Sequence, residues 1–196
     1  MTDTALSRAM SCTVDPPLLA LPDRVAELLI ELGSPPRLAA HLRAVHDVAH
    51  QLVDWMEKRY AAVLFDREAV LFGAATHDIG KSVYVPELSG PGAAHEQAGQ
   101  ALLLGRGVSP ELARFAATHA SWTESVGLED LLVSLADKIW KNKRVSDLED
   151  LVVARLAAAT GRPAWEEFIA LDEVLSRIGD NADDRLAFQA SFPIHD

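Results

Sequence analysis

Leu-Phe-Gly-Ala-Ala-Thr-His-Asp-Ile-Gly-Lys, residues 71–81, ends a helix of small residues in two adjacent side chains that can bind a metal, His77 and Asp78. Gly80 supplies a helix stop signal, and Lys81 adds a cation directly after it. An imidazole beside a carboxylate offers two hard-to-borderline metal ligands at one point of the chain. Because His-Asp pairs are common, the meaning of this pair depends on whether other histidines and aspartates converge on it.

The composition limits the class of protein. The chain has 196 residues, of which 49% are hydrophobic, so it is long enough for one domain with a full hydrophobic core. Its one cysteine, Cys12, excludes an intramolecular disulfide and a Cys-rich zinc site. The net charge of −11 argues against a nucleic-acid polymer as partner, because such a surface needs a basic footprint.

The N-terminal segment and the hydropathy pattern bear on location. Residues 1–20 lack a positive region followed by an apolar run, and we expect them to form a flexible polar lead-in rather than a signal peptide. No apolar segment approaches the ~18 residues that a membrane-spanning helix needs. The sequence therefore predicts a cytoplasmic protein with no membrane partner.

Apolar residues at helical spacing, bounded by proline and glycine, predict helices along the whole chain. The expected helices lie at about residues 22–32, 35–60, 66–77, 94–104, 109–120, 128–144, 146–160, 163–178 and 183–190. Sustained period-two alternation, the signature of a half-buried strand, is missing. The prediction is an all-α, single-domain helical bundle of roughly eight helices.

The expected helix at 35–60 carries three histidines. His41 lies one turn before Val45, on the apolar stripe that faces the core. At 100° per residue His46 is rotated by ~140° and His50 by ~180° from His41. We therefore expect His41, rather than His46, to point into the protein, although a lone histidine on such a stripe is more often an ordinary core residue than a ligand.

Three further side chains show the same ambiguity when each is taken alone. His119 continues the apolar face of its helix at the last turn, and His95 opens a helix with Gly99 one turn later. Asp137 is flanked by apolar residues, where an acid is costly to bury unless it is paired or binds a cation. Together with the His-Asp pair they make four histidines and two aspartates from separate helices, without a thiolate. Such a set favours Fe, Mn, Co, Ni or Zn in a site built between facing helices.

The order His41, then His77-Asp78, then Asp137 resembles the HD superfamily of metal-dependent phosphohydrolases. THDIGK (residues 76–81) and SLADKIWKNKR (residues 134–144) match the character of its two strongest segments. The segment at 93–122 is similar to the branch with two additional histidines, which includes hydrolases of symmetrical dinucleoside tetraphosphates. The Gly-Tyr-Pro run of the related cyclic-dinucleotide phosphodiesterases is missing, so we set that substrate aside. The resemblance covers about residues 37–145.

The resemblance implies a dinuclear site for divalent ions, with Fe or Mn first and Zn, Co, Ni or Mg as further options. The first ion would be held by His41, His77, Asp78 and Asp137, and the second by His95, His119 and a bridging Asp78. A metal-bound hydroxide would then hydrolyse a phosphoester or phosphoanhydride bond of a nucleotide or another small phosphorylated metabolite. The expected catalytic residues are Asp78 and Lys81, and the expected substrate contacts are Lys81, Lys141 and Arg144.

The same resemblance divides the chain. Residues 1–20 would be the lead-in, residues 21–145 the HD-domain metal-binding core, and residues 146–196 C-terminal helices that pack on the same domain. The loop at 82–94, rich in proline and glycine, would be a substrate lid and the source of specificity. Trp122 and Trp140 stand next to expected ligands and could stack on a base, but a role in the hydrophobic core is the simpler interpretation.

Two other functions stay open at this point. Related His/Asp scaffolds act as mixed-valent di-iron oxygenases, which need the same ligands, and a non-catalytic HD-like sensor or binding domain could keep the ligands for stability. The complete ligand set argues against the second of these. The oligomeric state is also open, a homodimer being one option.

Overall fold

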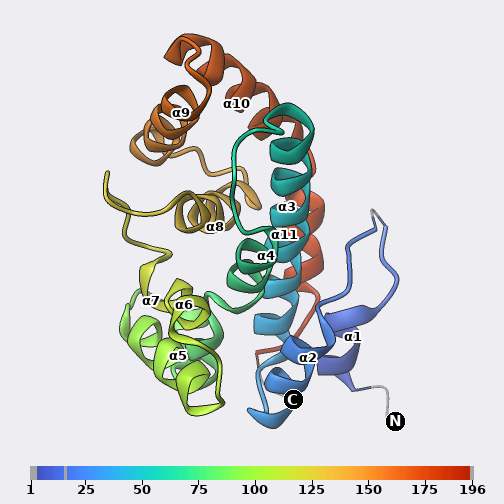
Figure 1. Cartoon of the computed structure of the whole chain (residues 1–196). Coiled ribbons are helices and arrows are strands. Elements are labelled where there is room, and N and C mark those ends of the chain that lie inside the picture. Colours follow the sequence, from blue (N-terminus) through green and yellow to red (C-terminus); the bar gives the residue numbers. More distant parts are fainter. Residues whose placement is uncertain (1–3, 16, 195–196) are drawn as a thin grey trace.

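A long helix, α3 (Pro36–Arg59), forms the axis of the molecule (Figure 1). Pro36 occupies its first turn, where the missing N–H of proline costs no hydrogen bond. Lys58 and Arg59 lie in its last turn, where positive side chains are favourable near the exposed carbonyls. Helices α1, α4, α8, α10 and α11 all pack against α3, so it positions most of the fold.

The computed structural model describes residues 4–15 and 17–194, and within these ranges it contains helices and no β-strand. The expected all-α fold is therefore confirmed. The other α-helices are α1 (Ala5–Ser11), α2 (Asp23–Glu31), α4 (Arg67–Thr76), α5 (Ala94–Gly105), α6 (Pro110–Ala113), α7 (Phe115–Thr118), α8 (Leu128–Ile139), α9 (Ser146–Thr160), α10 (Ala164–Gly179) and α11 (Ala182–Ala190). Two short 3-10 helices, η1 (Ile79–Ser82) and η2 (Val85–Leu88), follow α4.

Two hydrophobic clusters meet along α3. The first surrounds its C-terminal half, from Ala44 to Met56, and includes side chains of α4, α8, α9 and α10. The second surrounds its N-terminal part, from Leu38 to Leu42, and includes side chains of α1, α2 and α5. His41 falls on α3 at the boundary between the two clusters, so its ring is held between two packed regions. No helix of the described residues is both long and apolar enough to cross a membrane.

The N-terminal segment differs from the expected flexible lead-in. Residues 5–11 form α1, which begins with Thr4 accepting a hydrogen bond from the backbone N–H of Ser7. Leu6, Ala9 and Met10 share one face of α1 and are buried against the rest of the second cluster. The spacing i, i+3, i+4 of these three residues is that of an amphipathic helix. The polar residues between them made this pattern hard to recognise in the sequence. Residues 1–3 and Pro16 of the expected lead-in lie outside the described ranges.

Helix α8 ends five residues before the expected boundary at Arg144. Asn142 adopts a positive φ of 55°, and the N–H of Lys143 bonds to the carbonyl of Lys138. Together with the bond from the Asn142 N–H to Ile139, this is a Schellman cap, which stops a helix at its left-handed residue. The expected helix at 109–120 is likewise divided into α6 and α7, because the Arg114 guanidinium bonds to the carbonyl of Glu111, which the next helical turn would otherwise use.

Candidate metal centre

The six side chains that the sequence selected as ligands come together in one buried cluster. They arrive from five places in the fold: His41 from α3, His77 and Asp78 from the end of α4, His95 from α5, His119 from the end of α7 and Asp137 from α8. None of them is more than 7% exposed. Two overlapping groups of three residues each bring all their ligand atoms within 4.8 Å of one another. The first group is His41, His77 and Asp137, and the second is His77, Asp78 and His119.

Asp78 lies at the centre of the cluster, and its two carboxylate oxygens face different histidines. Oδ2 is 3.1 Å from Nε2 of His41 and 3.6 Å from Nε2 of His77. Oδ1 is 3.0 Å from Nε2 of His95 and 3.4 Å from Nε2 of His119. Asp137 closes the first side, with Oδ1 3.5 Å from Nε2 of His77. The carboxylate of Asp78 is thus placed between two sets of imidazoles, as a bridging ligand would be.

The rings of His77 and His119 are fixed by their own helices. Nδ1 of His77 lies 2.9 Å from the carbonyl oxygen of Ala74, and Nδ1 of His119 lies 3.1 Å from that of Ala116. A carbonyl oxygen can only accept, so Nδ1 carries the proton in both rings. In the neutral imidazole Nε2 then presents a lone pair to the cluster, which is the state that a metal ligand needs.

Several buried polar atoms of the cluster test whether a metal fits. Oδ1 of Asp78 and Nε2 of His95 are 3.0 Å apart, yet neither completes a hydrogen bond with any part of the chain that the structure describes. Nε2 of His41 and Nε2 of His77 are 3.3 Å apart, a distance that needs a proton or a cation between two ring nitrogens. Unsatisfied buried polar atoms are costly unless something else binds them. Nitrogen and oxygen donors without sulfur suit a divalent transition ion, so the residues fit the metal that the sequence implied.

The electrostatics keep the carboxylates ionised. Burial opposes ionisation of Asp78 most strongly, but the charge of His77 and the other imidazoles around it hold the pKa of Asp78 well below its ordinary value. Asp137 is also buried, and the contact with His77, helped by Lys138, lowers its pKa. His41 shows the opposite balance, since burial lowers its pKa and favours the neutral ring. Both carboxylates of the cluster are therefore ionised although they are buried, which is the state that binds a cation.

Two lysines lie against the two carboxylates. Nζ of Lys81 is 2.5 Å from Oδ2 of Asp78, as the sequence position next to the pair suggested. Nζ of Lys138 is 2.5 Å from Oδ2 of Asp137, and sequence reasoning had not selected Lys138. Both side chains are partly exposed, at 18% and 15%, so this is the side on which solvent approaches the cluster. The sequence signal for Lys138 was its position directly after the expected ligand Asp137. Adjacency in a helix does not tell whether two side chains point toward each other.

The other two expected substrate contacts differ from each other. Nζ of Lys141 lies 5.7 Å from the ring centre of Trp140, and that ring packs edge-on against His41 with centroids 4.8 Å apart. Lys141 therefore contacts Trp140, which in turn packs against His41 of the cluster. Arg144 is bonded instead to Glu149 and Asp172, at 2.7 and 2.8 Å. Two carboxylates already engage its guanidinium, and its role as a phosphate contact stays a prediction.

The two tryptophans occupy different surroundings. Trp140 is buried in the first hydrophobic cluster, in line with the simpler interpretation. Trp122 is half-buried at the edge of the same cluster, with Nζ of Lys138 5.7 Å from its ring centre. The indole of Trp122 is thus near the exposed side of the metal centre, where a substrate group could reach it.

The expectation that His46 points away from the protein interior is wrong. His46 is buried, but its ring packs on His50, with centroids 4.7 Å apart, instead of joining the cluster. Its Nδ1 has no hydrogen-bond partner among the described residues. Burial, and next the neighbouring His50, lower the pKa of His46 from 6.5 to about 3.

This pKa predicts acid destabilisation from a residue outside the metal centre. Between pH 6.5 and 3 the unfolded chain binds a proton at His46 that the folded protein does not bind, so stability falls as the pH falls below 6.5. The expected loss between pH 6.5 and 5 is about 2 kcal/mol, from ~1.4 kcal/mol per pH unit. Urea unfolding of wild type and His46→Leu at both pH values, with chelator present, measures it. The variant should lose about 2 kcal/mol less than wild type, and equal losses would contradict the prediction.

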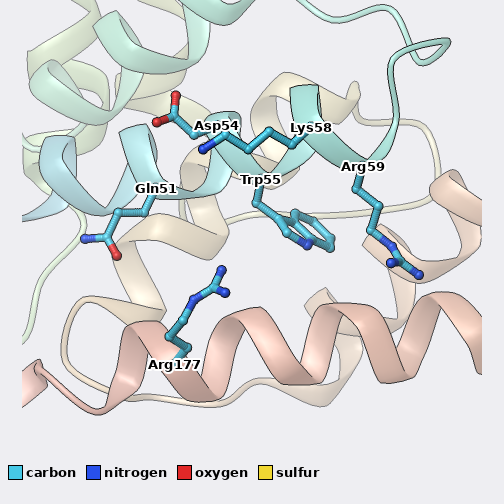
Figure 2. Close-up of a pocket in the computed structure, with 6 residues that line it drawn as sticks. All are labelled: Gln51, Asp54, Trp55, Lys58, Arg59 and Arg177. Atoms are coloured by element: carbon cyan, nitrogen blue, oxygen red, sulfur yellow. The ribbon is translucent and has the colours of Figure 1, made fainter.

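A separate hollow of about 590 Å³ lies between the C-terminal half of α3 and α10 (Figure 2). It is lined by Gln51, Asp54, Trp55, Lys58, Arg59 and Arg177, and contains none of the six cluster residues. Its three cations stand in the last turns of α3 and α10, where positive side chains are favoured by the helix ends. Because the histidines and aspartates that could hold a metal ion gather in the buried cluster and not in this hollow, the cluster is the candidate functional site.

The fold and the site define a class, namely an all-helical protein with buried histidines and aspartates able to hold metal ions. Residues 38–140, more than half of the chain, match the sequence model of the HD domain. The chain therefore belongs to the HD domain family, within the superfamily of metal-dependent phosphohydrolases. Comparisons with curated proteins and with solved structures gave no match.

Proposed function

We propose that this protein is a metal-dependent phosphohydrolase that cleaves a phosphoester or phosphoanhydride bond of a nucleotide or another small phosphorylated metabolite. The observation that carries this proposal is the position of Asp78, whose Oδ2 faces His41 and His77 while Oδ1 faces His95 and His119. One carboxylate between two imidazole pairs is suited to two divalent ions. Such ions would supply an activated water at neutral pH and neutralise charge on the phosphoryl oxygens.

The lysines supply the protein's own part in substrate binding. Without a metal, Lys81 and Lys138 balance the charges of Asp78 and Asp137. When divalent ions neutralise these carboxylates, the two ammonium groups are available to contact a phosphate on the exposed side of the cluster. Phosphoryl transfer depends mainly on such positioning and charge neutralisation, so these contacts matter for rate as well as affinity.

The loop at 82–94 begins directly after Lys81 and contacts His95 through Glu87, which supports its proposed role as a lid. Val83 and Tyr84, at its start, are large hydrophobic residues exposed to solvent by 58% and 41%. Exposed apolar side chains beside a polar centre are suited to contact the non-phosphate part of a substrate. Movement of this loop would also widen access, because the ligand cluster itself is almost fully buried.

Metal analysis paired with activity assays tests the proposal. Protein purified without chelator should contain about two equivalents of divalent metal and release phosphate from at least one of a panel of nucleotides, dinucleoside tetraphosphates and phosphomonoesters. Equal phosphate release with and without oxygen excludes the oxygenase alternative. Oxygen consumption without phosphate release would support that alternative instead. Bound metal with neither reaction would favour a sensor or binding domain.

Lys138 provides a test of substrate contact that leaves the ligands intact. Lys138→Met should lower kcat/KM roughly 10- to 100-fold, because one charge-assisted hydrogen bond to phosphate is lost. Metal content should stay at the wild-type value, since the lysine is not a ligand. Lys143→Met, an exposed lysine in the turn after α8, is the matched control and should change little. A loss of metal in Lys138→Met would show a structural role instead.

A further inference from the structure

Glu87, in the loop that precedes α5, is bonded to three donors at the start of that helix. Its Oε2 accepts from Nδ1 of His95 at 2.5 Å and from the backbone N–H of His95 at 3.1 Å. Its Oε1 accepts from the backbone N–H of Ala94 at 3.2 Å. The carboxylate therefore caps the first turn of α5 and holds the imidazole of His95 at the same time.

Gly92 leaves room for the carboxylate of Glu87. A Cβ atom added at Gly92 would overlap the carboxyl group of Glu87, so a side chain at residue 92 would displace this carboxylate from its position. Glu87 lies in η2, between Lys81 and His95, and thus belongs to the segment that we assign as the substrate lid. The lid and the metal centre are in this way joined through one side chain.

His95 differs from the other histidines of the cluster in how its ring is held. His77 and His119 donate Nδ1–H to carbonyls three residues earlier in their own helices, so their orientation is set by local backbone. The ring of His95 is held by the side chain of Glu87, which comes from another segment. With Nδ1 bonded to Glu87, the other ring nitrogen of His95, Nε2, faces Oδ1 of Asp78 at 3.0 Å, so both atoms are placed to bind one cation.

We infer that Glu87 is a positioning residue for His95 and, through it, for the second metal position formed by His95, His119 and Asp78. The inference rests on the proposed dinuclear function. Its consequence is that the lid controls metal occupancy, because a lid that opens far enough to withdraw Glu87 releases His95. The first metal position, formed by His41, His77 and Asp137 with Asp78, does not depend on Glu87.

Two measurements on the full-length protein test this role. In metal-free protein, long-range 15N–1H NMR should show a proton on Nδ1 of His95, and Glu87→Ala should reduce the fraction of His95 rings that carry this proton. In Mn²⁺ titrations followed by calorimetry, Glu87→Ala should keep the tighter of two equivalents and weaken the other roughly 10- to 100-fold, the usual effect of losing a group that orients a ligand.

Two further variants separate positioning from general stability. Glu96→Ala removes a neighbouring carboxylate in the same first turn of α5 and should leave both Mn²⁺ equivalents unchanged. Gly92→Ala displaces the Glu87 carboxylate without altering its chemistry and should reproduce the loss of the weaker equivalent.

The outcomes distinguish this inference from the proposed function. Equal weakening of both Mn²⁺ equivalents, or no weakening, in Glu87→Ala would overturn the positioning role. If wild-type protein binds no Mn²⁺, the proposed metal centre fails, and the NMR tautomer of His95 then decides alone whether Glu87 fixes the ring. A wild-type His95 ring without a proton on Nδ1 would overturn the inference in either case.

Discussion

Asp78→Ala should abolish the second Mn²⁺ equivalent, weaken the first and lower phosphate release by about 10³-fold or more. Asp78 approaches four histidines, through Oδ2 on one side and Oδ1 on the other. Its removal takes a ligand from both metal positions, and a loss of 10³-fold corresponds to about 4 kcal/mol of transition-state stabilisation. Metal analysis and initial rates on the best substrate of the panel measure the effect.

The control variants keep this experiment interpretable. Asp78→Asn retains the shape of the side chain and one neutral oxygen ligand, so it should fold and still lose most of the activity. Asp150→Asn, at an exposed position on α9, removes one carboxylate from the protein without touching the cluster and should behave as wild type. If folded Asp78→Ala still released phosphate at the wild-type rate, the assignment of this cluster as the catalytic site would be wrong.

Gly80→Ala should be the most destabilising single substitution of those considered, at about 3 kcal/mol. A Cβ atom at residue 80 would overlap the backbone carbonyl of His95 and lie 2.6 Å from the backbone nitrogen of Gly99. Backbone atoms cannot rotate away as a side chain can, so η1 and α5 must separate. For a chain of this length the melting temperature should fall by about 6–12 °C. Calorimetry in the presence of chelator isolates this effect from metal binding.

The same substitution should disturb the metal centre, because η1 follows Asp78 directly and α5 carries His95. We therefore expect Gly80→Ala to lose the Mn²⁺ equivalent that depends on His95. Gly105→Ala is the matched control on α5, since nothing lies within 4 Å of its added Cβ. It should be neutral or up to about 1 kcal/mol more stable, through the reduced entropy of the unfolded chain. Similar melting temperatures for the two variants would contradict the close approach of η1 and α5.

Sequence reasoning could select candidate ligands because helical phase is a local property. At 3.6 residues per turn, the apolar stripe of α3 directs His41 into the cluster, whereas His46, expected to point elsewhere, is also buried and packs on His50. The same reasoning was less successful at the ends of helices. The left-handed Asn142 ends α8 before Arg144, and three apolar residues within a polar segment were enough to form α1.

The contacts around the ligands could not be predicted in the same way. Glu87 and His95 are eight residues apart, but they meet because the loop folds back over Gly92, which periodicity does not describe. Lys138 turns toward Asp137, while Arg144, selected for its position after Asp137, is bonded to carboxylates of α9 and α10. Each of these outcomes depends on which charged groups the tertiary structure brings within reach.

By itself, then, the sequence determined the all-α class and the residue types of a cation site, because helix formation and the inward face of each helix follow from spacing along the chain. Only the tertiary structure decided that Asp78 separates two pairs of imidazoles and that Glu87 holds one of them. The physical reason is the distance along the chain over which each effect acts. Hydrophobic periodicity acts over a few residues, whereas the meeting of ligand atoms within about 3–4 Å depends on close helix contacts, such as that between Gly80 and Gly99, across the whole fold.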